Sequence, residues 1–306
     1  MSTASPRGPH AAAPARPSRL APWLAAARPR TLPAAIVPVV VGLALAARTH
    51  ALDVGVAGVT LVAALLIQVG TNLANDYYDF VAGADTHERL GPQRITQAGL
   101  AAPATVRAAA FAVLAAAGVA GAYLVAIGGW PILLIGLASL VAAVAYTGGP
   151  FPLAYRGLGD LFVFAFFGIV AVAGTVWLQT GVLGAPVLVL SLPVACLATA
   201  ILVVNNLRDI ATDARAGKRT LAVRLGASAT RAEYALLVAA PYVVVGAVAA
   251  TTGSVGLLLP FATVPLAVRE VRALLRRAGA ELNASLAGTA RLHLLFGVLL
   301  AAGLLA

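Results

Sequence analysis

Successive apolar runs of membrane-spanning length constrain this chain more than any other feature. A hydrocarbon core is crossed by roughly 20 mainly apolar residues in a helix. Runs of this kind, separated by charged or Gly/Pro breaks, lie at residues 32–47, 54–79, 104–127, 130–148, 159–180, 186–208, 232–250, 254–272 and 287–306. With 61% apolar and only 10% charged residues, the sequence predicts an all-α integral membrane protein of about nine transmembrane helices.

The distribution of basic residues supports this division into spans. If the N-terminus is cytoplasmic, all Lys and Arg residues except Arg48 lie in or beside the N-terminal tail and the even-numbered loops. This asymmetry is the positive-inside rule, so the net charge of +10 indicates topology rather than nucleic-acid binding. The two long polar loops, about 80–103 and 209–231, then lie on the cytoplasmic side, where we expect the functional residues.

The N-terminal residues differ in composition from the rest of the chain. Residues 1–30 are rich in Ala, Pro and Arg, which predicts a disordered, basic cytoplasmic tail. A signal peptide is the alternative, but the apolar run from Leu32 is too long for one and eight more spans follow it. Residues 31–306 are therefore predicted to form a single transmembrane domain.

Two similar acidic motifs end the second and sixth predicted spans. Each places one asparagine and two aspartates on one helical face, because residues three and four apart are neighbours on a helix. The first motif contains Asn72, Asp76 and Asp79, and the second contains Asn205, Asp209 and Asp213. Both spans run in the same direction, so this weak internal repeat predicts that the two motifs face each other.

The ligand chemistry of these motifs indicates a hard cation. Carboxylate and amide oxygens without His or Cys suit Mg²⁺, which completes its coordination with water and substrate phosphate oxygens. A single acid at a helix end is more often only solvated. The four acids and two asparagines of the motifs, gathered on one side of the membrane, instead predict a site for a metal and a diphosphate.

Basic and aromatic residues accompany the acids. Arg94, Lys218 and Arg219 are candidates for gripping phosphate, although each also contributes to topology. Tyr146 lies at the same end of the fourth span, where an aromatic face can stabilise a carbocation. An interfacial tyrosine is the alternative, and the one favoured for Tyr155. His293 is interpreted as a hydrogen-bonded packing residue.

These residues resemble a known family. The segment Asn75-Asp76-Tyr77-Tyr78-Asp79, taken with Asp209-x-x-x-Asp213, resembles the two Asp-rich motifs of the UbiA superfamily of intramembrane prenyltransferases. Residues 83–99, 146–155 and 205–209 are similar to its menaquinone branch. Many relatives carry a third aspartate four residues after the second. Here the next is Asp85, whose role the resemblance leaves open.

The resemblance implies a fold, a reaction and a set of site residues. It implies helices around a central cavity and transfer of a polyprenyl chain from polyprenyl diphosphate to 1,4-dihydroxy-2-naphthoate, with loss of CO₂ and diphosphate, giving demethylmenaquinone. It further implies Mg²⁺ bound by Asp76, Asp79, Asp209 and Asp213, with Tyr146 facing the allylic cation. The diphosphate would be bound by Asn72, Arg94, Asn205, Lys218 and Arg219. The implied location is the bacterial inner membrane, with the N-terminus and active-site loops cytoplasmic.

Three alternatives remain at this stage. Another aromatic acceptor, such as 4-hydroxybenzoate or homogentisate, would leave the family unchanged. A secondary transporter also uses duplicated halves, but its acids normally lie near the membrane midplane rather than at one end of the helices. A membrane alcohol phosphotransferase holds its metals on a single dense aspartate run, which this sequence lacks.

Overall fold

The structure is a computed structural model that describes residues 20–49, 52–85 and 89–306. Every regular element in this part of the chain is helical, which confirms the predicted all-α class. The α-helices are α1 (Ala21–Ala26), α2 (Pro33–Ala47), α3 (Val54–Val81), α4 (Pro103–Ala145), α5 (Gly159–Val163), α6 (Ala171–Thr180), α7 (Ala185–Arg215), α8 (Leu221–Thr252), α9 (Val264–Arg276) and α10 (Leu282–Leu305). The shorter elements are η1 (Pro29–Thr31), η2 (Ala154–Arg156), η3 (Phe164–Val170), η4 (Val255–Thr263) and η5 (Gly279–Glu281).

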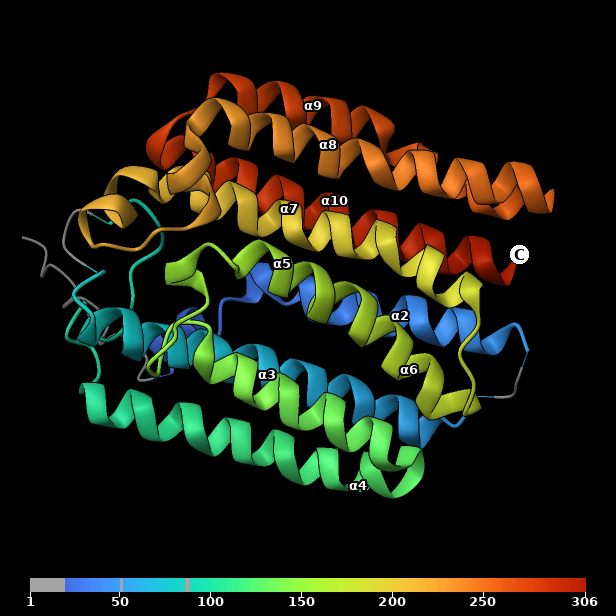
Figure 1. The fold of residues 1–306 in the computed structure, drawn as a ribbon, viewed down its shortest axis with the longest axis horizontal. Helices are drawn as coiled ribbons and strands as arrows, with labels where there is room; N and C mark the ends of the chain where they lie inside the picture. The colour runs from blue at the N-terminus through green and yellow to red at the C-terminus, as the bar shows by residue number, and fades with distance from the viewer. Residues whose placement is uncertain (1–19, 50–51, 86–88) are drawn as a thin grey trace, which may run out of the picture.

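The long helices lie side by side along the long axis of the molecule (Figure 1). Among the described residues, six helices are long and apolar enough to cross a membrane, or seven if the bent pair Ala21–Thr31 and Pro33–Ala47 forms one span. The chain is thus a multi-pass membrane protein, while the count of nine stays a prediction. The predicted eighth span is divided between η4 and α9, and α9 carries several arginines along its length.

Helix α4 explains a further part of the difference in count. Its 43 residues include Gly129, whose φ of 68° and ψ of −157° interrupt the helical path. The chain reverses there and returns beside its own first half (Figure 1), so a Cβ added at Gly118 would lie 3.9 Å from Leu140. The two apolar runs predicted at 104–127 and 130–148 correspond to these two halves.

The N-terminal prediction needs a correction. Residues 1–19 lie outside the described residues, but α1 and η1 fold within 21–31, so the predicted irregular tail does not extend to residue 30. Pro22 lies in the first turn of α1. A proline is tolerated there because its missing N–H has no intrahelical partner in any case.

The predicted sixth loop, residues 209–231, is also wrong. Helix α7 continues through both aspartates to Arg215, and α8 begins at Leu221. Thr220 caps α8, since its hydroxyl accepts a hydrogen bond from the Val223 backbone N–H. The polar composition of this segment therefore reflects exposed helical ends and a connection of a few residues.

The bundle is packed most tightly around α7. Its residues share the largest apolar core with α2, α6, α8, α9 and α10. On the other face of α7, a Cβ added at Gly168 of η3 would lie only 2.1 Å from the Cβ of Ala195, so the two backbones are in direct contact. Element η3 is a π-helix, a form that is rare and frequent at functional sites. The α2, α3, α4, η3 and α7 segments together enclose a cavity.

Candidate active site

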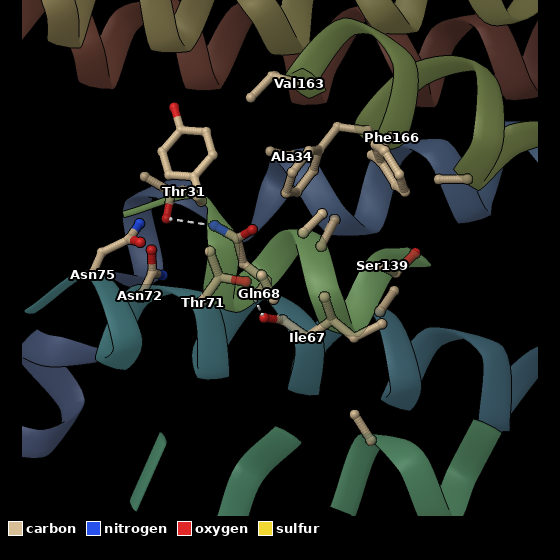
Figure 2. A pocket seen from close by; sticks show the side chains of 18 of the residues that line it. Thr31, Ala34, Ile67, Gln68, Thr71, Asn72, Asn75, Ser139, Val163 and Phe166 are labelled. Atoms are coloured by element: carbon tan, nitrogen blue, oxygen red, sulfur yellow. Dashed lines mark hydrogen bonds between the residues drawn. The ribbon is translucent and has the colours of Figure 1, made fainter. Parts of the chain in front are cut away.

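A cavity of about 890 Å³ runs along the inside of the bundle. On α3 its lining extends from Thr60 to Asp79, a helical distance of about 28 Å at 1.5 Å per residue. The far end is lined by small and apolar residues, whereas the near end is polar (Figure 2). The cavity thus joins a long apolar chamber to a charged mouth.

The first acidic motif lies at this mouth and is almost fully enclosed. The carboxylate of Asp76 accepts hydrogen bonds from the backbone N–H groups of Ile95 and Thr96, both at 3.1 Å. Asp79 accepts from Arg94 at 2.8 Å and from the Tyr155 hydroxyl at 3.0 Å. Hydrogen bonds to the carboxylates of α3 therefore hold the loop between α3 and α4 over the cavity mouth.

Charged residues within that loop form a second layer. The carboxylate of Asp85 pairs with Arg89 and, at 2.9 Å, with Arg94 Nε. Burial raises the pKa of Asp85, and the two arginines oppose that rise. Burial lowers the pKa of Arg94, but Asp79 and Asp85 raise it by more, so the guanidinium stays charged. Its Nη1 atom is buried without a hydrogen-bond partner in the described part of the chain.

The second acidic motif has a different environment. Asp209 is bound by two nitrogens of Arg208, at 2.8 and 2.6 Å. The same guanidinium also donates to Asn205 and to Asn283 of α10, both at 2.8 Å. The carboxylates of the second motif are buried beside the cavity, whereas Asn205 is part of its lining.

Lys218 connects the two motifs. Its Nζ lies 3.6 Å from Asp79 and 3.9 Å from Asp213, so one positive charge stands between carboxylates of both copies. This position suits a cation. No group of three His, Cys, Asp or Glu side chains close enough to hold a metal occurs among the described residues. The carboxylate and amide oxygens at the mouth are, by their chemistry, the donors that a hard cation such as Mg²⁺ prefers.

Two tyrosines occupy different positions at the mouth. Tyr146 lines the cavity at the end of α4, and a Cβ added at Gly159 would lie 2.9 Å from its hydroxyl, so a larger residue there would displace the tyrosine. Tyr155 donates to Asp79, and its ring lies 5.3 Å from Lys218 Nζ. Burial and the Asp79 carboxylate raise the pKa of Tyr155. The phenol is thus a hydrogen-bond donor to Asp79, a contact that the interfacial interpretation did not predict.

The structure brings most of the predicted site residues together, but Asp209 and Asp213 are buried beside the cavity rather than in its lining, and Arg219 lies apart. Five of them line the cavity mouth besides Asp76 and Asp79: Asn72, Arg94, Tyr146, Asn205 and Lys218. Arg219 does not; its side chain is exposed and its backbone N–H donates to the Tyr155 carbonyl. His293 is fully buried, and neither ring nitrogen has a hydrogen-bond partner among the described residues, so the predicted hydrogen bond is absent.

Sequence reasoning missed two polar cavity residues, one in the N-terminal turn and one in the middle of α3. Arg28 and Gln68 both line the cavity. Gln68 is a polar residue inside the apolar run of α3. A polar residue within a membrane span often marks a functional site, and this was the signal that could have identified Gln68. Arg28 was included in the predicted tail.

These features define a class of integral membrane protein with a polar, charged site at one end of a buried apolar cavity. Comparison with known proteins identifies the family. The pattern of the UbiA prenyltransferase family matches residues 35–304. The chain is 42% identical to the 1,4-dihydroxy-2-naphthoate octaprenyltransferase of Mycobacterium leprae over 82% of this chain and 85% of that protein. It is 36% identical to the Haemophilus influenzae protein of the same name, over 94% of this chain and 96% of that one.

A solved structure has the same fold. The structure of a UbiA homolog from Archaeoglobus fulgidus bound to DMAPP and Mg²⁺ superposes with a TM-score of 0.63 at 13% identity, over 92% of this chain and 99% of that one. The family match over residues 35–304 and the two bacterial relatives show that the chain belongs to the UbiA prenyltransferase family.

Proposed function

We propose that this protein transfers a polyprenyl group from a polyprenyl diphosphate to 1,4-dihydroxy-2-naphthoate. Diphosphate and CO₂ leave, and the product is demethylmenaquinone in its hydroquinone form. One observation carries the proposal: a long apolar cavity opens onto a mouth lined by Asp76, Asp79 and the cations Arg89, Arg94 and Lys218, with Asp209 and Asp213 buried beside it. A prenyl chain matches the chamber, and a diphosphate matches the mouth.

The acidic motifs and the basic residues divide the work on the donor. Asp76, Asp79, Asp209 and Asp213 would hold Mg²⁺, which supplies positive charge to the leaving diphosphate when bound. Arg94 offers a buried Nη1 without a partner in the described residues, and Lys218 offers a mobile point charge. Both cations stabilise negative charge on the bridging oxygen as the C1–O bond breaks.

The chamber controls the allylic cation. Its walls exclude water, which would otherwise quench the carbocation. The aromatic ring of Tyr146 lies at the mouth, where it can stabilise positive charge at C1. The electron-rich ring of the acceptor then forms the C–C bond to C1, and the carboxyl carbon leaves as CO₂ with its bonding electrons returned to the ring.

The choice of acceptor rests on the relatives. The two bacterial relatives at 42% and 36% identity are both named for 1,4-dihydroxy-2-naphthoate. The two matches cover 82% and 94% of this chain. Membership of a prenyltransferase family also argues against the transporter alternative. We place the protein in the bacterial inner membrane, with the N-terminus and the cavity mouth on the cytoplasmic side, because the basic residues gather there.

The test uses the full chain purified in detergent, an all-trans polyprenyl diphosphate and carboxyl-labelled 1,4-dihydroxy-2-naphthoate. Parallel reactions contain 4-hydroxybenzoate or homogentisate, and each is repeated with EDTA in place of Mg²⁺. Prenylated product together with labelled CO₂, both lost with EDTA, is the expected result. Product from another acceptor alone would overturn the choice of naphthoate. Turnover in EDTA would overturn the proposal that the reaction requires Mg²⁺.

A further inference from the structure

The turn that carries Arg28 is held in an uncommon conformation. Arg28 has φ 53° and ψ 67° and is the only residue other than glycine with positive φ among those described. Non-glycine residues rarely adopt this left-handed region unless the surroundings impose it. The surroundings here include Asn72, whose side chain donates to the Ala27 carbonyl at 3.0 Å.

A second set of hydrogen bonds holds the same turn from its other side. The Thr31 hydroxyl donates to the Arg28 carbonyl at 3.0 Å and accepts from Gln68 Nε2 at 3.2 Å. Figure 2 shows this link between Gln68 and Thr31, with Asn72 beside it. Two side chains of α3 therefore fix the backbone on which Arg28 stands, and backbone strain maintained in this way is typical of functional sites.

Two buried polar atoms at this place have no partner in the described part of the chain. They are Arg28 Nη2, a donor, and Gln68 Oε1, an acceptor. Both residues line the cavity. Buried polar atoms are nearly always hydrogen-bonded in folded proteins, so an unpaired donor and an unpaired acceptor facing one cavity indicate a ligand that supplies both.

The charge of that ligand follows from the other cations of the cavity. Arg94 and Lys218 contact Asp79, and Arg89 pairs with Asp85, so these three belong to the acidic mouth. Arg28 makes no direct ion pair with an acid among the described residues, although Asp76 and Asp79 lie near enough to act on its charge. The side chain of Arg30 is exposed and lines the same cavity. A carboxylate that arrives without a metal ion needs a guanidinium of this kind, because its planar fork matches two carboxylate oxygens.

We propose that Arg28 and Gln68 form the recognition site for an aromatic hydroxy acid. Arg28 binds the carboxylate, and Gln68 Oε1 accepts a hydrogen bond from a ring hydroxyl. Asn72 and Thr31 act as positioning residues that hold Arg28 in place. The inference rests on the proposed function for the identity of the acceptor, and it assigns Asn72 to the turn rather than to the diphosphate.

The experiment measures equilibrium binding without the prenyl donor, in the full-length protein. The probes are 1-hydroxy-2-naphthoate, which carries both groups, 1-naphthol, which lacks the carboxylate, and 2-naphthoate, which lacks the hydroxyl. We expect Arg28→Gln to weaken binding of both acids by about 10- to 100-fold, because a charge-assisted hydrogen bond is lost. Binding of 1-naphthol should stay unchanged. Arg48→Gln, which removes an exposed arginine at the end of α2, is the matched control.

Gln68→Leu keeps the proposal testable if Arg28→Gln fails to fold. It should weaken the probes that carry the hydroxyl more than 2-naphthoate, which loses only the support that Gln68 Nε2 gives to the Arg28 turn through Thr31. Equal weakening of all three probes, or weakening of Mg²⁺-diphosphate binding with the naphthoates unchanged, would overturn the site. Because binding is measured without turnover, an inactive wild-type protein that still prefers the acid would contradict the proposed reaction and leave this site standing.

Discussion

The two aspartate motifs begin as similar sequences and end in different surroundings. Both lie on long helices, α3 and α7, near the same end of the bundle. In the first motif, the carboxylates bind the backbone and side chains of a loop that covers the cavity mouth. In the second, Asp209 binds an arginine of its own helix, and Asp213 faces the short connection to α8.

The first copy is therefore structural, whereas the second is more open, since only Asp209 is tightly paired, with Arg208 of its own helix. The first copy has its oxygens occupied by Ile95, Thr96, Arg94 and Tyr155, so it also organises the loop. Asp213 of the second copy contacts only Lys218 among these partners. A mutation in the first copy should therefore affect both chemistry and loop order, whereas one in the second should affect chemistry alone.

The largest effect is expected from removing one charge in each copy. Asp76→Asn and Asp209→Asn should each lower turnover by about 10²- to 10³-fold, because each weakens stabilisation of the leaving diphosphate. Only Asp76→Asn should also increase protease cleavage within residues 82–102. Turnover and limited proteolysis of membrane vesicles measure the two effects.

The control for this pair is Asp53→Asn, since Asp53 caps the opposite end of α3 and asparagine caps a helix equally well. Equal loop cleavage in Asp76→Asn and Asp209→Asn would show that the two copies do not differ in the way described.

The next effect concerns the residue that joins the copies. Lys218→Met removes the ammonium between Asp79 and Asp213. We expect KM for the prenyl diphosphate to rise about tenfold, in line with loss of one charged hydrogen bond, while KM for the acceptor stays unchanged. Steady-state kinetics with each substrate varied in turn measures both constants.

Arg276→Met is the control for Lys218→Met, because it removes an exposed cation at the end of α9. An unchanged donor KM in Lys218→Met would mean that this lysine serves membrane topology only.

Local spacing predicted the parts of the site that depend on one helix. The i, i+4 relation of Asn72 and Asp76 was enough to place them on one face, because helical geometry alone sets that face. The same reasoning failed at residues 209–231, where the polar ends of two helices, α7 and α8, look like one long loop in sequence. Polarity reports exposure to solvent, and a helix that leaves the membrane is exposed without being irregular.

Long-range approach explains what spacing missed. Tyr155 meets Asp79 across 76 residues, and Asn72 meets Ala27 across 45. The strained φ of Arg28 exists only because α3 approaches this turn, so no local pattern around Arg28 predicts it. The π-helix η3, which turns the aromatic residues Phe166 and Phe167 toward the cavity lining, likewise depends on packing against α7.

The smallest expected effect tests how the second copy reaches the loop of the first. Asn283 of α10 accepts from Arg208 and donates to the Leu90 carbonyl, both at 2.8 Å. Asn283→Ala breaks this bridge and should destabilise the protein by about 1–2 kcal/mol, because Arg208 is left with fewer partners. At this chain length that is a fall in Tm of about 2–6 °C. Thermal unfolding in detergent measures it.

A matched control separates the bridge from general loss of a polar group. Thr251→Ala removes a hydroxyl that bonds only its own helix at the end of α8, and should lower Tm by less than Asn283→Ala. If Asn283→Ala leaves protease cleavage of the loop unchanged, Asp76 alone is sufficient to hold the loop. If the loop is cut more readily in Asn283→Ala, the second copy contributes to loop order through α10, and the division between a structural and an open copy becomes one of degree.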